Sequence, residues 1–82
     1  MPRSTHTRDY RLFREFLRSV RRQAGLTQKE VAKALGVHQS YVSKYETGER
    51  RLDVVELRQI CRALKIPLGA FITRLDKRLS RN

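Results

Sequence analysis

Four side chains that form hydrogen bonds without carrying negative charge stand within six consecutive positions: Gln39, Ser40, Ser43 and Lys44. If residues 38–46 are helical, these four form one continuous stripe, and Tyr41, Val42 and Tyr45 lie on the other side. An amide, two hydroxyls and an ammonium can donate to acceptors on base edges, and phosphates would repel none of them. The stripe therefore suits the major groove of duplex DNA. Taken alone, it is more typical of an ordinary solvent-exposed helix face.

The elements around the stripe favour the DNA-binding interpretation. Thr27 and Glu30 have the spacing of a capping box, so a helix is expected from this cap to about Leu35. Gly36 provides the positive φ at which a chain leaves a helix, and a second helix is expected over about 39–47. Two short helices, a glycine-containing turn and a polar second helix are typical of a helix-turn-helix motif, here over about 27–47.

Three further amphipathic helices are expected to surround this pair. The first, over 9–24, carries an apolar stripe at 3.6-residue spacing: Leu12, Phe13, Phe16, Leu17, Val20 and Ala24. The fourth, capped by Asp53, is expected to bury Val54, Leu57, Ile60, Cys61 and Leu64. The fifth begins at Pro67 with the stripe Leu68, Phe71, Ile72, Leu75 and Leu79. We predict an all-α domain over 9–79, with a flexible basic arm at 1–8 and a tail at 80–82.

Composition narrows the class of function. Nineteen Lys and Arg against eight Asp and Glu give a net charge of +11, so a polyanion is the expected partner. No apolar run is long enough to span a membrane or to serve as a signal peptide, which indicates a cytoplasmic protein. The single cysteine, Cys61, excludes an internal disulfide, and no cluster suits a metal, a cofactor or catalysis. We expect neither an enzyme nor a small-molecule ligand.

The sequence resembles a known family at GLTQKEVAKALGVHQSYVSKYETGE, residues 25–49. This stretch is similar to the helix-turn-helix domain of phage repressors and Cro proteins, the XRE family. The resemblance covers about 17–72 and includes the start GLTQ at 25–28, Gly36-Val37, Gly48 and the segment 64–68. It implies a five-helix, lambda-repressor-like fold encoded by a bacterium or phage.

The resemblance also implies roles for particular residues. The family's glutamine at the position of Gln28 bonds a phosphate and braces the first residue of the recognition helix, here Gln39. Gln39 would then read a base, most naturally adenine through N6 and N7. Ser40, Ser43 and Lys44 are further base-reading candidates, and Lys44 is suited either to guanine or to a phosphate.

Other residues are expected to support the interface. The family pattern pairs Arg21 with Glu46 in a partly buried ion pair that orients the recognition helix. The Tyr41 hydroxyl is expected either to reach a phosphate or to belong to a plain core tyrosine. Arg50 and Arg51 follow the recognition helix and are candidates for phosphate contacts, with a solvated loop as the alternative.

These features predict a sequence-specific regulator of transcription, a repressor, that binds double-stranded DNA as a homodimer on a palindromic operator. Val55, Ile66 and Leu68 are candidates for the two-fold contact. Arg3 or Arg8 of the arm could enter a minor groove, with a disordered arm that makes no contact as the favoured alternative. The alternative function is an antitoxin or restriction-modification controller that also binds a protein partner.

Overall fold

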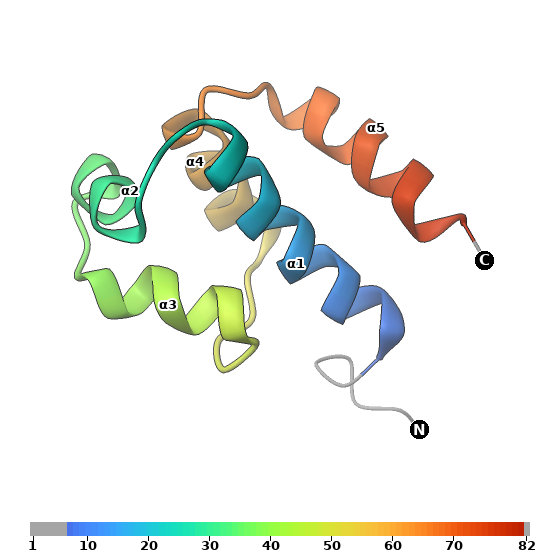
Figure 1. Cartoon of the computed structure of the whole chain (residues 1–82), viewed down its shortest axis with the longest axis horizontal. Coiled ribbons are helices and arrows are strands. Elements are labelled where there is room, and N and C mark those ends of the chain that lie inside the picture. The colour runs from blue at the N-terminus through green and yellow to red at the C-terminus, as the bar shows by residue number, and fades with distance from the viewer. Residues whose placement is uncertain (1–6, 82) are drawn as a thin grey trace.

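The computed structural model describes residues 7–81, and these residues form five α-helices and no strand. The helices are α1 (Arg8–Gln23), α2 (Gln28–Leu35), α3 (Gln39–Thr47), α4 (Val54–Ala63) and α5 (Leu68–Leu79), shown in Figure 1. The predicted all-α, five-helix fold is confirmed. Within the described range no helix is both long enough and apolar enough to cross a membrane.

Helix α1 lies at the centre of the fold, between α3 and α5 (Figure 1). Helix α2 packs on α3 and α4, and α4 packs in turn on α5. The side chains of Leu17, Ile60 and Phe71 are almost fully buried where these helices meet. Burying each such side chain contributes roughly 1.5–3 kcal/mol, so apolar packing holds the fold together.

Side-chain caps fix where α2 and α4 begin. The Thr27 hydroxyl accepts from the Glu30 amide at 3.1 Å, and the Glu30 carboxylate accepts from the Thr27 amide at 2.8 Å. Asp53 and Glu56 form the same reciprocal pair at the start of α4. Both capping boxes predicted from the sequence are present, and each satisfies two backbone donors that the helix leaves unpaired.

Three expectations about helix packing are wrong. Val54 and Ile72 were expected in the core, yet they are 63% and 42% exposed. Ile72 lies about 100° around α5 from the buried Phe71, so it falls at the edge of the apolar stripe. Ala24 is also exposed, because it caps the end of α1 rather than continuing its buried face.

The start of the domain also differs from the expectation. Helix α1 begins at Arg8, and the Thr7 side chain caps it by accepting from the backbone N–H of Tyr10. The Arg8 guanidinium donates to the carbonyls of Leu79 and Arg81, so Arg8 holds α1 against the end of α5 and does not form part of an arm. Residues 1–6 of the predicted arm, Arg3 included, and residue 82 of the tail lie outside the described residues.

Candidate nucleic-acid interface

The polar stripe of α3 points away from the core. Gln39, Ser40 and Lys44 are exposed and Ser43 is half-buried, whereas Val42 and Tyr45 on the other side are buried. The expected separation of the helix into a polar and an apolar side is therefore present. The stripe offers an amide, two hydroxyls and an ammonium, which are the groups that read base edges in a major groove.

The start of α3 is free of negative charge. The first turns of α1, α2 and α4 each contain an acidic residue, whereas those of α3 and α5 contain none. Its cap is His38, whose Nδ1 accepts from the Ser40 backbone N–H at 3.3 Å. Because a helix N-terminus carries partial positive charge, a first turn without a carboxylate leaves this end open to an anion such as a phosphate.

A chain of hydrogen bonds runs from the core to the tip of Gln39. Arg21 donates to Glu46 through Nε at 2.7 Å and through Nη2 at 3.1 Å. The Gln28 amide nitrogen donates to Glu46 Oε1 at 2.9 Å, and the Gln28 oxygen accepts from the Gln39 amide at 3.5 Å. Gln28 therefore lies against Gln39, as the resemblance implies. The hydrogen bond to Gln28 uses one N–H of the Gln39 side-chain amide. The carbonyl oxygen and the second N–H of that amide take no part in it.

The Arg21–Glu46 pair joins α1 to α3. The side chains of Arg21 and Glu46 are 9% and 3% exposed, and Arg21 also donates to the Leu26 carbonyl at 2.9 Å. Two buried charges of opposite sign are tolerated when the geometry is bidentate and the remaining donors are satisfied. The pair ties the end of the recognition helix to α1 and to the loop before α2.

Arg50, in the loop that follows α3, lies beside Tyr41. Its guanidinium is 4.5 Å from the centre of the Tyr41 ring and forms an ion pair with Glu56. The hydrogen bond to Glu56, and then the Tyr41 side chain, raise the pKa of Arg50. Tyr41 is half-buried and its ring meets Tyr45 edge-on at 5.8 Å. Arg50 is thus placed beside the recognition helix, with part of its charge offset by Glu56.

Arg51 points toward α1. Its guanidinium is 5.6 Å from the centre of the Tyr10 ring, whose hydroxyl is buried without a hydrogen-bond partner among the described residues. The two neighbouring arginines therefore diverge, one toward Tyr41 and the other toward Tyr10. Only Arg50 lies next to a residue of the predicted interface.

Arg14 supports the recognition helix, a role that sequence reasoning missed. Its Nη1 donates to the Glu46 carbonyl at 3.2 Å, near the C-terminus of α3, where a cation is favoured by the helix dipole. Gly48 ends the helix with φ of +88°, and a Cβ there would lie 3.0 Å from Arg14 Nε. Spacing along the first helix placed Arg14 off the apolar stripe, and only the packing of α1 on α3 shows its role.

Cys61 belongs to the core. It is fully buried in α4, and burial raises the pKa of its thiol to about 11. Burial, followed by the neighbouring charge of Glu46, likewise raises the pKa of Tyr45. Both groups are therefore neutral at physiological pH and act as packing side chains.

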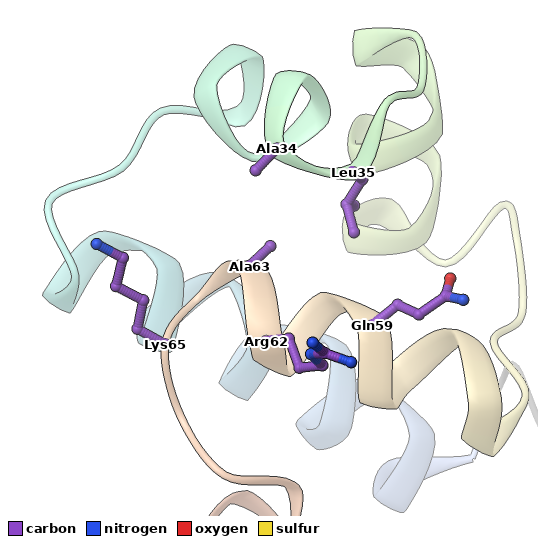
Figure 2. A pocket seen from close by; sticks show the side chains of 6 residues that line it. All are labelled: Ala34, Leu35, Gln59, Arg62, Ala63 and Lys65. Carbon is purple, nitrogen blue, oxygen red and sulfur yellow. The ribbon is translucent and has the colours of Figure 1, made fainter.

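A groove of about 540 Å³ lies between α2 and α4, and Figure 2 shows its lining residues: Ala34, Leu35, Gln59, Arg62, Ala63 and Lys65. None of them belongs to the polar stripe of α3. Among residues 7–81, no three His, Cys, Asp or Glu side chains are grouped so that they could hold a metal ion.

A polar helix held on two others, within a five-helix fold, defines a helix-turn-helix DNA-binding domain. A family model described as helix-turn-helix matches residues 17–71. Over 58 residues the chain is 36% identical to an uncharacterized HTH-type transcriptional regulator, y4dJ, of Sinorhizobium fredii (strain NBRC 101917 / NGR234). That match spans 71% of this chain and 75% of the relative.

Solved structures agree with the family match. An XRE-family like protein from Pseudomonas syringae pv. tomato str. DC3000 superposes with a TM-score of 0.81 at 40% identity, over 89% of this chain and 88% of that one. The restriction-modification controller protein C.Esp1396I superposes with a TM-score of 0.85 over 94% and 99% of the two chains. At 21% identity, this superposition shows a shared fold alone.

The chain belongs to the XRE family of helix-turn-helix proteins, and it is a DNA-binding transcriptional regulator. This family is a class of DNA-binding proteins without enzymatic activity, as the sequence predicted.

Proposed function

We propose that the protein is a sequence-specific repressor that reads duplex DNA through α3. The observation that carries this proposal is the chain of hydrogen bonds from Arg21 through Glu46 and Gln28 to Gln39. A side chain braced in this way loses less conformational freedom on binding, so its amide can discriminate between bases. Ser40, Ser43 and Lys44 extend the same reading surface.

Phosphate contacts surround this surface in the proposal. Gln28 reaches a phosphate while it braces Gln39, and the hydroxyl of Tyr41 reaches another. Arg50 lies close enough to Tyr41 to join this contact, and Arg51 extends it toward α1. Backbone contacts of this kind supply affinity and salt dependence without sequence information.

The protein acts as a homodimer on a palindromic operator whose half-sites lie about one helical turn, roughly 34 Å, apart. The large apolar side chains most exposed among the described residues are Val54, Val55 and Ile72, on α4 and α5. A two-fold contact through them, extended by the half-buried Ile66 and Leu68, would remove this surface from water. The related fold of C.Esp1396I has been solved as a tetramer on its natural 35 base-pair operator.

The test is selection of bound sites from random duplex DNA, followed by affinity measurements on the selected site. We expect a two-fold symmetric motif. Gln39→Ala should weaken binding to it by about 1–3 kcal/mol and remove the base preference at one position of each half-site. Non-operator binding should persist.

Gln59→Ala is the matched control, because Gln59 is an exposed glutamine on α4 outside the polar stripe. It should leave affinity and base preference unchanged. If Gln39→Ala weakens all sequences equally, Gln39 contacts no base. If no preferred sequence emerges from the selection, the repressor assignment is wrong.

A further inference from the structure

Four cations follow one side of α5 and the residues just after it: Arg74, Lys77, Arg78 and Arg81. All four are exposed, and a spacing of three and four residues places Arg74, Lys77 and Arg78 in one row on the helix, with Arg81 just beyond its end. We call this row the α5 stripe. The acidic Asp76 lies on the other side of the helix, because it is two residues from both Arg74 and Arg78, which corresponds to a rotation of about 200° around the helix axis.

Two arginines of the α5 stripe, Arg74 and Arg78, lie against an aromatic ring. The guanidinium carbons of Arg74 and Arg78 lie 5.4 and 5.2 Å from the centre of the Phe16 ring, which is itself 3% exposed. Arg74 also donates to the Gln23 side chain at 3.5 Å. Stacking on a ring satisfies the face of a guanidinium and leaves most of its N–H donors directed at solvent.

Among the described residues, no carboxylate forms an ion pair with the α5 stripe. The ion pairs among residues 7–81 use other arginines, namely Arg8, Arg11, Arg21 and Arg50. The helix dipole favours cations in the last turn of α5, which accounts for Lys77 and Arg78 but not for Arg74. A row of unpaired like charges opposes folding by self-repulsion, so helix stability alone does not explain the stripe.

The α5 stripe and the recognition helix lie on different sides of the molecule. Helix α1 separates α5 from α3 in Figure 1. Arg14 of α1 contacts α3, whereas Gln23 of α1 contacts α5. These two positions are nine residues apart, which places them about 180° from each other around the helix. A duplex bound to Gln39 and Lys44 therefore uses a different face from the one that carries the stripe.

We propose that the α5 stripe is a second, sequence-independent DNA site, through which an operator-bound protein holds another duplex segment by its phosphate backbone. Forked guanidinium groups match phosphate geometry, and contacts confined to phosphates carry no base preference. The protein would then bridge two DNA segments, an activity beyond reading one operator.

The test is a capture experiment with the full chain. A duplex carrying the selected site is immobilised and saturated with protein, and a fluorescent duplex lacking that site is then added. The wild-type protein should retain the second duplex. The variant Arg74→Gln/Arg78→Gln should bind the selected site within about twofold of wild type but capture the second duplex at least tenfold less. Losing two phosphate contacts should also lower the salt slope of capture by about 1.8.

The matched control is Arg58→Gln/Arg62→Gln, which removes the same charge from exposed positions of α4. It should capture the second duplex like wild type. Equal loss in both double variants would overturn the proposal, because net charge alone would then explain capture. Unchanged capture by Arg74→Gln/Arg78→Gln would overturn it too, as would a parallel loss of binding to the selected site. If the wild-type protein binds no preferred site, this is already seen when the immobilised duplex is loaded. That result would contradict the proposed function and not the second site.

Discussion

At the scale of single residues, the Arg50–Glu56 pair allows the charge of the interface to be changed without breaking a helix. Glu56 accepts from the Asp53 amide with one oxygen and from Arg50 with the other. In Glu56→Gln the side-chain oxygen can still serve the capping box, because glutamine replaces glutamate in this motif. The substitution therefore removes the charge that offsets Arg50 and keeps the start of α4.

We expect Glu56→Gln to strengthen non-operator DNA binding several-fold at low salt and to raise the salt slope by up to about one. Arg50→Gln should lower the slope by about 0.9 and leave base preference unchanged. The measurement is affinity for random duplex DNA across a salt series. An unchanged slope in Arg50→Gln would place Arg50 outside the DNA footprint.

Residue types predicted the polar stripe, because its four members are close in sequence and a helix brings them together by period alone. Supporting contacts between helices were harder to predict. Arg14 acts on α3 from 32 residues away, and Arg50 acquires its partner Glu56 only when the loop folds back on α4. The role of His38 as a cap was missed because histidine is not among the usual capping residues.

At the scale of helices, the Arg21–Glu46 pair sets how α3 sits on α1. Glu46→Gln should destabilise the protein by about 3–5 kcal/mol, since it leaves the buried Arg21 without a counter-charge. A domain of this size has little more stability than that, so the variant should melt at a much lower temperature. Thermal and urea unfolding followed by circular dichroism measure the loss.

Glu15→Gln is the comparison for Glu46→Gln. It breaks the Arg11–Glu15 pair, in which both side chains are about half exposed and the charged atoms are 3.7 Å apart. Exposed pairs of this kind contribute at most about 0.5 kcal/mol, so stability should barely change. Similar small losses in the two variants would show that the Arg21–Glu46 pair does not fasten α3.

Helix ends in this chain use left-handed residues, and one of them is not glycine. Gly36 follows α2 with φ of +71°, whereas Lys65, just after α4, has φ of +62°. Lys65→Gly should stabilise the protein by about 0.5–1 kcal/mol because it relieves the steric cost of a Cβ in this conformation. Urea unfolding at constant pH and salt is the measurement.

Gly36→Ala makes the reverse change at an equivalent position. A Cβ at Gly36 would meet no atom within 4 Å, so only the backbone conformation opposes it. We expect a loss of about 1 kcal/mol. If Lys65→Gly also destabilises, the lysine side chain makes a stabilising contact that outweighs its backbone strain.

Helix boundaries were predictable where local chemistry fixes them. The capping boxes and the glycines at helix ends gave the limits of α2 and α3 to within about a residue. The buried faces of α4 and α5 were less predictable, since Val54 and Ile72 satisfy helical spacing but lie beyond the reach of neighbouring helices. The helical period of the sequence defines an apolar stripe. How much of its width is buried depends on how closely the neighbouring helices pack against it.

At the scale of the whole molecule, the net charge has opposite effects on dimer formation and on DNA binding. Each copy carries +11, so two copies repel one another while both attract DNA. Salt screens both effects, with a Debye length of about 10 Å at 0.1 M and about 3 Å at 1 M. An apolar contact through Val54, Val55 and Ile72 involves no ion pair that salt would weaken.

We therefore expect salt to act in opposite directions on the two associations. Without DNA, raising sodium chloride from low to high concentration should lower the dimer dissociation constant about fivefold, by screening repulsion. The same change should weaken operator binding steeply. Analytical ultracentrifugation and fluorescence anisotropy measure the two equilibria.

Val55→Ser should raise the dimer dissociation constant at every salt concentration without reversing its trend, because it removes apolar area and no charge. A dimer that dissociates as salt rises would instead be held by ion pairs, and the apolar side chains of α4 and α5 would then not form its contact.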